Sequence, residues 1–171
     1  MRRTSAFAAS LLILLVSAGA RAEQAVLALG VSPEYSVLRP DGAAHGTGAG
    51  LHAEYGVDEY LNLRFVAGYD RYWADNDEAL HSVRFGLGAT YGLDNTEVVP
   101  FLSVGIGGFV SIDEQVDYDL DFGGAFGLGF DWLILDSFSL GLEATYHALF
   151  TDIERVMATL GIRINWRIDV M

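Results

Sequence analysis

Beyond residue 22, apolar residues alternate with polar or small residues along most of the chain. A period of two is typical of β-strands that have one apolar face. Eight segments show this pattern, separated by turn-forming residues: 24–33, 47–55, 61–73, 79–91, 98–111, 120–132, 138–150 and 156–168. Most are close to the roughly ten residues that a tilted strand needs to cross a bilayer. We therefore expect eight membrane-crossing strands.

The connections between these segments alternate in character. Short connections lie at residues 56–60, 92–96 and 133–137. More acidic connections lie around residues 39–47, 74–78, 113–118 and 151–155. Tight and polar connections in alternation suit the two ends of an up-and-down meander, and an even strand number lets the meander close into a barrel.

The apolar face could point into the barrel or out of it. Large residues from eight strands would overfill a lumen that is only just wide enough for side chains. In the five most regular segments the apolar set contains no Asp, Glu or Arg, as expected where a lipid-facing charge costs about 2–4 kcal/mol. The prediction is an all-β fold, an eight-stranded antiparallel up-and-down transmembrane barrel, and it disfavours a soluble lipocalin-like barrel.

Aromatic residues gather at the ends of the predicted strands, where interfacial girdles are expected. One set lies beside the short connections: Tyr55, Tyr60, Tyr91, Trp132, Phe138 and Trp166. A second set lies toward the acidic connections: Tyr69, Trp73 and Phe150.

The first 22 residues differ from the rest. Arg2 and Arg3 precede an apolar stretch from Ala6 to Val16, and Ala20-Arg21-Ala22 forms a small-x-small site. This pattern predicts a secretory signal peptide at 1–22, and the run is too short for a spanning helix. The barrel domain would then be 23–171. Removal of residues 1–22 would take away three Arg and no acid, changing the net charge from −13 to −16.

Composition narrows the possible functions. The chain has no Cys, which excludes disulfides, thiol chemistry and a lipid-modified cysteine. All ten basic residues are Arg, against 23 acids, so a nucleic-acid partner is not expected. We expect no cofactor.

Several stretches, taken in order, resemble the small outer-membrane β-barrel domain proteins of Gram-negative bacteria, the OmpA-like and opacity-like group. They are Tyr55-Gly56-Val57-Asp58 leading into Leu61-Asn62-Leu63-Arg64, Val99 to Gly107, and Phe126 to Asp131 before Phe138-Ser139-Leu140. The resemblance covers essentially the whole chain after residue 22. It implies export to the cell outer membrane, contact with membrane lipid and lipopolysaccharide, and a monomeric barrel.

The last strand also resembles the signal that such proteins present to the outer-membrane assembly machinery. The residues that carry this resemblance are Thr159, Gly161, Ile164 and Trp166. The chain continues to Met171 beyond the aromatic residue.

Five charged residues fall on the predicted inner face: Glu54, Arg64, Arg84, Glu143 and Arg163. Glu143 is expected almost opposite Arg163. We interpret the set as a plug of Arg–carboxylate pairs, in which bidentate hydrogen bonds compensate desolvation. A gated ion path is the alternative for the same residues.

Catalytic and metal-binding patterns are weak. His45 is expected in a loop, His52 and His147 inside near opposite ends, and His81 on the outer face, so no two share a metal. Ser103, Ser111 and Ser139 have no His and carboxylate beside them for a triad. The acids from Asp113 to Asp121 could hold a hard cation, but a solvated acidic loop fits them better.

The function predicted from these features is that of a non-enzymatic integral outer-membrane protein with a structural or surface-interaction role. Its acidic loops would face the exterior, and Gly and Arg/Glu pairs would fill its lumen. Two alternatives stay open, a narrow channel for ions or small solutes and an enzyme that modifies membrane lipid.

Overall fold

A computed structural model describes residues 25–39, 44–73, 79–93, 96–112, 118–150 and 156–170. The predicted signal peptide and most of the acidic connections lie outside these residues. Within them no helix is both long and apolar enough to cross a membrane.

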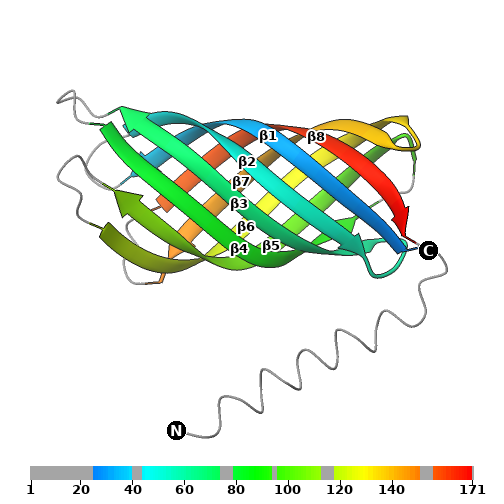
Figure 1. Cartoon of the computed structure of the whole chain (residues 1–171), viewed down its shortest axis with the longest axis horizontal. Helices are drawn as coiled ribbons and strands as arrows, with labels where there is room; N and C mark the ends of the chain where they lie inside the picture. Colours follow the sequence, from blue (N-terminus) through cyan, green and yellow to red (C-terminus); the bar gives the residue numbers. More distant parts are fainter. Residues whose placement is uncertain are drawn as a thin grey trace, which may run out of the picture.

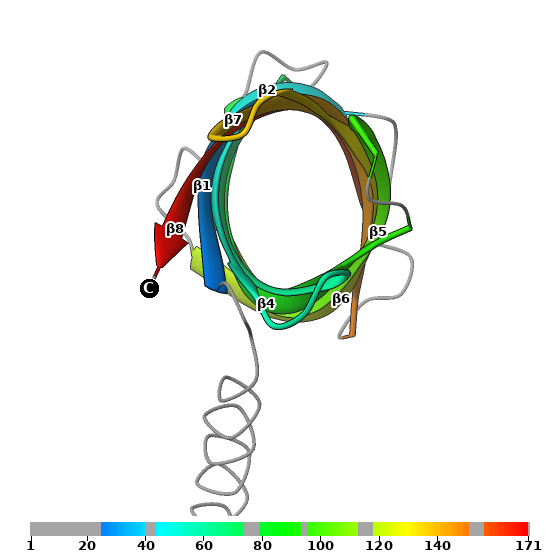
Figure 2. The same ribbon diagram turned by 90° about the vertical axis from the view of Figure 1, so that its right-hand side faces the viewer.

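Eight antiparallel strands form one closed barrel, in which each strand pairs with its neighbours in sequence and β8 pairs with β1 (Figures 1 and 2). This architecture confirms the predicted fold class. The strands are β1 (Ala25–Arg39), β2 (Ala44–Gly56), β3 (Leu61–Trp73), β4 (Ala79–Gly92), β5 (Val98–Ile112), β6 (Tyr118–Leu135), β7 (Phe138–Leu149) and β8 (Val156–Val170).

The first strand is longer than predicted. The expected segment 24–33 ends at Pro33, because proline lacks an amide hydrogen and is confined to edges and irregular points of sheets. β1 nevertheless continues to Arg39, paired with β2 on one side throughout. On the other side, the pairing with β8 passes from Val31 opposite Ile164 to Glu34 opposite Gly161, so the ladder is interrupted around Pro33.

Two connections are shorter than predicted. β2 begins at Ala44, so His45 lies in a strand and its expected placement in a loop is wrong. Between β6 and β7 the turn comprises only Asp136 and Ser137, and the pairing shifts register between Leu133 and Leu135. The extra apolar residues there continue the strand, which explains why a stretch of five residues looked like a connection.

The barrel is apolar outside and polar inside. Large apolar side chains point outward, with Leu51, Leu87 and Ile106 each more than 60% exposed. The largest fully buried side chains are instead Arg163, Tyr72, Asp70, Ser36 and Ser139. A soluble protein would reverse this distribution, so the outer face suits hydrocarbon and the inner face forms a closed polar core.

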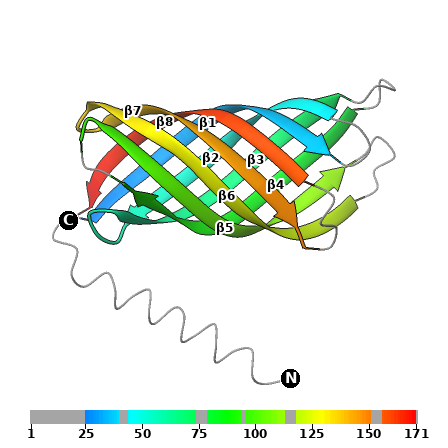
Figure 3. The ribbon, with the colours of Figure 1, turned by 180° about the vertical axis from the view of Figure 1, so that it is seen from behind.

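The two ends of the barrel differ. The start of β1 and the end of β8 lie at the same end as the short turns 57–60 and 136–137, on the left of the barrel in Figure 3. We call it the turn end, and the opposite end the loop end.

Asp58 holds the turn between β2 and β3. Its carboxylate accepts hydrogen bonds from the backbone N–H groups of Tyr60 (2.8 Å) and Leu61 (2.7 Å). These two donors lower the pKa of the Asp58 carboxyl below its usual value. A group with a lowered pKa stabilises the fold above the unfolded-state pKa and loses that contribution as the pH falls through the folded-state pKa.

We therefore expect Asp58→Ala to lower barrel stability slightly at neutral pH and not at all at a pH below the carboxyl pKa. Urea unfolding of the folded barrel in micelles at the two pH values measures this difference. Asp136→Ala, in another turn at the same end, is the control. An equal loss at both pH values would show that the charge on Asp58 does not matter.

Candidate functional site: the barrel lumen

Arg163 of β8 lies at the centre of the ionic network in the turn-end half of the lumen. Its guanidinium donates to Glu54 (Nη2 to Oε1, 3.0 Å), Glu143 (Nη1 to Oε2, 3.1 Å) and Asp131 (Nε to Oδ1, 3.2 Å). Its side chain is only 1% exposed. Its Cζ also lies 4.5 Å from the centre of the Phe101 ring, a cation–π contact. Every face of this guanidinium therefore has a partner.

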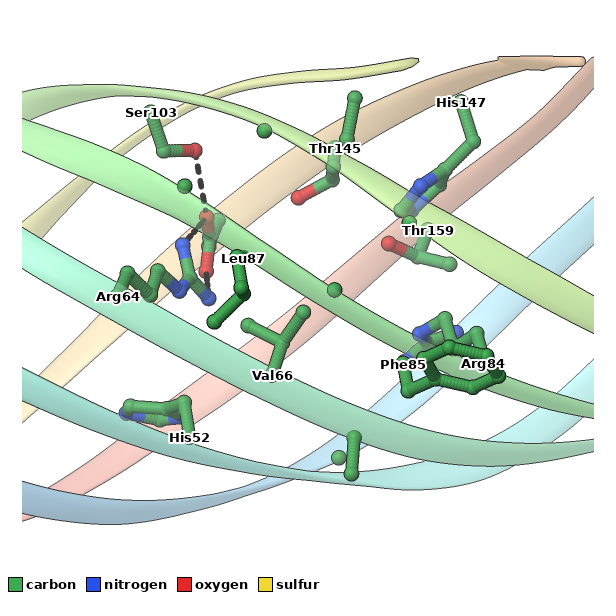
Figure 4. Close-up of a pocket in the computed structure, with 18 of the residues that line it drawn as sticks. His52, Arg64, Val66, Arg84, Phe85, Leu87, Ser103, Thr145, His147 and Thr159 are labelled. Atoms are coloured by element: carbon green, nitrogen blue, oxygen red, sulfur yellow. Dashed lines mark hydrogen bonds and ion pairs between the residues drawn. The ribbon is translucent and has the colours of Figure 1, made fainter. Parts of the chain in front are cut away.

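Arg64 of β3 reaches the same carboxylate from the other side of the lumen. It holds Glu143 in a bidentate pair, with Nη2 2.6 Å from Oε2 and Nη1 bonded to Oε1. The Ser103 hydroxyl donates to Oε1 of Glu143 at 3.0 Å, and dashed lines in Figure 4 mark these bonds. Bidentate, charge-assisted bonds of this kind are the strongest that side chains form.

A polar chain extends the network toward the turn end. Asn165 donates from Nδ2 to Asp131 (3.1 Å) and to the Ser139 hydroxyl (3.1 Å). Its Oδ1 lies 2.5 Å from Nε2 of His52. Two guanidinium groups and three carboxylates, together with this chain, fill the turn-end half of the lumen.

A second ionic cluster lies nearer the loop end. Arg84 of β4 bonds to Asp70 of the adjacent strand β3 (Nη1 to Oδ2, 2.5 Å) and to Glu34 of β1 across the lumen. Glycine at position 68 makes room for this group, because a Cβ there would lie 2.6–2.7 Å from the Arg84 guanidinium atoms. Gly48 makes room for Asp70 in the same way, because a Cβ there would lie 2.4 Å from Oδ1 of Asp70.

Apolar side chains close the lumen between this cluster and the loop end. Tyr72, Phe109, Leu149 and Met157 pack together as the buried hydrophobic cluster of the protein. The Tyr72 hydroxyl donates to the sulfur of Met157 across the lumen at 2.8 Å. Leu38, Ala44 and Leu80 pack against them. We call these seven residues the apolar plug.

A cavity of about 80 Å³ separates the two ionic clusters, and its lining is drawn in Figure 4. One wall has no side chains because glycines of β4, β5 and β6 line it: Gly86, Gly88, Gly105, Gly107 and Gly123. The two ring nitrogens of His147 also line it and have no protein partner. A cavity of this size has room for about five water molecules or more.

The five charged residues of the predicted plug all lie in this lumen, in two clusters. Glu143 pairs in register with Gly161, one diagonal step from Arg163, and the two side chains bond. Sequence reasoning missed Glu34, Asp70 and Asp131 as ionic partners. Asp70 and Asp131 fall on the inward phase of the alternation and could have been found that way; Glu34 lies beyond the predicted end of its strand.

The chemistry available here is that of packing and ion pairing. Among the described residues no group of His, Asp and Glu is arranged to hold a metal ion. His52, Asn165, Ser139 and Asp131 form one polar chain, but the Ser139 hydroxyl bonds to Asn165. A nucleophilic serine needs a base in direct contact. Asp119 and Asp121 of the acidic stretch lie in β6, and Asp113, Glu114 and Asp117 lie outside the described residues.

An apolar outer wall, a lumen crossed by ion pairs and exposed aromatic side chains toward both ends of the strands define an integral membrane β-barrel. Residues 8–166 match the family of the outer membrane protein beta-barrel domain, and the chain belongs to this family. The family membership confirms the resemblance seen in the sequence and indicates an outer-membrane location. No match is found among curated protein sequences.

Three solved structures share the fold at low sequence identity. Neisserial surface protein A has a TM-score of 0.69 and 16% identity over 82% of this chain and 96% of that chain. Ail, the attachment invasion locus protein of Yersinia pestis, in complex with the heparin analogue sucrose octasulfate, has a TM-score of 0.59 and 13% identity over 85% of this chain and 99% of that chain. The outer membrane enzyme PagL has a TM-score of 0.52 and 16% identity over 82% of this chain and 99% of that chain.

Proposed function

We propose that this protein is a non-conducting, non-enzymatic barrel of the outer membrane, whose rigid body holds acidic loops at the cell surface for a structural or surface-interaction role. The observation that carries the proposal is the closed lumen. A pore needs a continuous polar path, and a catalyst needs an accessible reactive group.

Three barriers follow one another along the barrel axis. The network around Arg163 fills the turn end, the pairs of Arg84 follow beyond the cavity, and the apolar plug lies at the loop end. Desolvating an ion to pass the plug would cost several kcal/mol. The three guanidinium groups below it are each held by at least two carboxylates, so none of them is free to bind a passing anion.

The names of two similar barrels, a Neisserial surface protein and an attachment invasion locus protein, support a role at the cell surface. The heparin analogue bound to Ail is a polyanion. The loops of the present chain carry most of its excess acid, so we propose that they recognise partners other than polyanions. PagL shows that the same fold can carry an enzyme, although no serine among the described residues hydrogen-bonds to a histidine.

Export and assembly are part of the proposal. The signal peptide at 1–22 would be cleaved after Ala22, leaving Glu23 as the mature N-terminus. Thr159 and Gly161 of β8 face the lumen, whereas Trp166 is 49% exposed on the outer wall near the turn end. The outer wall presents Trp166 to any machinery that binds this strand from the membrane side.

Conductance in planar bilayers tests the closed lumen. We expect the purified wild-type protein to give no stepwise current. Tyr72→Ala/Met157→Ala removes the middle of the plug but leaves both ionic clusters, so we expect it to stay silent as well. Current should appear only when Arg84→Ala and Arg163→Ala are both added, because each of the three barriers along the axis has then lost a central side chain.

Heat-modifiable gel migration shows whether each variant is folded. Discrete current steps from the folded wild type would contradict the proposal and favour the channel. Hydrolysis of membrane lipid by the wild type, lost in Ser103→Ala, Ser111→Ala or Ser139→Ala, would favour an enzyme.

A further inference from the structure

Charged and imidazole side chains are distributed very unevenly on the outer wall. Along the described outward positions of all eight strands there is no Asp, Glu or Lys, although the whole chain has 23 acids. The only charged or imidazole side chains at these described outward positions are those of Arg39, His45, Arg71 and His81. All four lie on β1 to β4 at the loop end, and the same level of β5 to β8 is apolar. We call these four residues the basic patch.

The strand register makes the patch contiguous. Arg71 of β3 lies directly opposite His81 of β4 and opposite Thr47 of β2. His45 lies two residues from Thr47 along β2, on the same face, and Val37 is opposite it in β1. Residues that are diagonal on neighbouring strands lie about 7–8 Å apart, so Arg39, His45 and Arg71 follow one another around the wall.

Two tyrosines orient the imidazoles in the same way. Tyr35 Oη lies 2.5 Å from Nδ1 of His45, and Tyr69 Oη lies 2.6 Å from Nδ1 of His81. The rings are nearly parallel in both pairs, with centres 6.0 and 5.9 Å apart. Nδ1 is thus occupied in each ring and the Nε2 edge is left for another partner. Two such pairs on separate strand pairs give the patch a repeated geometry.

The two arginines of the patch form no ion pair with any described residue. Arg39 and Arg71 are both exposed, and within the described part of the chain no carboxylate forms an ion pair with either. The inward-facing arginines 64, 84 and 163, in contrast, each form ion pairs with carboxylates. An unpaired guanidinium on the wall of a membrane protein requires an anion or water.

The depth of the patch matches a lipid head group. Ten residues separate Leu61 from Arg71 on β3, or about 23 Å along the axis for a strand tilted by roughly 45°. The apolar band of such barrels is about 25 Å tall, which places Arg71 at its outer edge. Trp73, 50% exposed, lies just beyond it in the same strand, at the level where aromatic side chains meet head groups.

We propose that the basic patch binds the phosphate group of an anionic lipid in the outer leaflet. The guanidinium of Arg71 would make a bidentate contact with phosphate oxygens, and Nε2–H of His45 and His81 would donate from either side. The patch points sideways from the wall, with the apolar rows of Tyr69 and Val83 below it to pack against acyl chains. This orientation favours a lipid over a soluble polyanion. The inference depends on the membrane location in the proposed function and not on the closed lumen.

The test uses the purified mature barrel in neutral-detergent micelles, titrated with lipid A and followed by native mass spectrometry. We expect Arg71→Gln to weaken lipid A binding about tenfold, and Arg39→Gln/Arg71→Gln to weaken it further. Arg167→Gln at the turn end removes the same charge and should leave binding unchanged. Lipid A with its phosphates removed should bind the wild type as weakly as lipid A binds the double variant.

Each variant is checked for heat-modifiable migration, and all three positions lie outside the lumen network. Equal lipid A binding by the wild type and Arg71→Gln would overturn the proposal, as would equal binding of phosphorylated and dephosphorylated lipid. Sucrose octasulfate provides a third arm: binding of this soluble polyanion at the patch without retention of lipid A would also overturn it. Conductance by the wild type would refute the closed lumen and leave this result intact.

Discussion

Arg163→Ala is expected to lower the free energy of unfolding by about 3–5 kcal/mol, the usual cost of removing one partner from a buried ionic network. The change leaves Glu54, Asp131 and Glu143 facing one another without the guanidinium that bonds to all three. Arg64 remains as the only other cation of this cluster. Urea unfolding in micelles, followed by tryptophan fluorescence, measures the loss, and a lower temperature of the heat-modifiable gel shift should accompany it.

A second substitution tests whether the loss comes from stranded charge. Glu54→Gln in the Arg163→Ala background should recover part of the stability, because it removes one of the uncompensated carboxylates. Arg167→Ala at the turn-end rim should cost less than 1 kcal/mol, because this half-buried arginine forms no ion pair with a described carboxylate and is partly open to solvent. If Arg163→Ala keeps wild-type stability and heat resistance, the network does not fasten the barrel.

Gly88→Ala should be about as damaging for a different reason. A Cβ at this position would lie 2.1 Å from the backbone oxygen of Val104 in β5. Backbone atoms cannot yield as a flexible side chain can, so β4 and β5 must separate locally. We expect a loss of about 1–3 kcal/mol or more, the range for overpacking in a filled interior, measured by the same urea titration.

Gly124→Ala is the matched control. This residue lies on β6 of the same barrel, and a Cβ there would meet nothing closer than 3.7 Å, at the Phe150 ring. The substitution also reduces the freedom of the unfolded chain, so stability should be unchanged or slightly higher. Equal effects at the two positions would mean that close contact between strands does not explain the glycines of the wall.

The alternation of side chains predicted most of the fold. Seven of the strand segments begin or end within three residues of the observed bounds, because each change of phase or run of turn residues coincides with a real turn. β1 is the exception. Its final six residues follow Pro33, and the pairing with β2, which runs past the proline without a break, carries the strand on to where its pairing with β8 resumes at Glu34. Local signals cannot show that a neighbouring strand compensates for a missing donor.

The sequence predicts which side chains face the lumen, but not which of them contact one another there. Alternation places Arg84 inside, but its contacts with Glu34 come from a strand that is not adjacent to β4. Which inward side chains meet depends on how far the strands are staggered around the barrel, and this stagger is not visible in one sequence. The apolar plug was missed for a related reason: Tyr72 and Met157 occur in the polar phase, where an apolar residue looks like an irregularity.

The ladder between β1 and β8 is the one that joins the two ends of the chain, and it is also the one interrupted at Pro33. Side chains inside the lumen span this joint: His52 to Asn165, Glu54 to Arg163 and Tyr72 to Met157 connect residues that are 113, 109 and 85 positions apart. Closing so long a chain segment carries an entropic cost that only contacts made after closure can offset. The lumen network thus holds β1 and β8 together, and we expect a barrel without it to open first between these two strands.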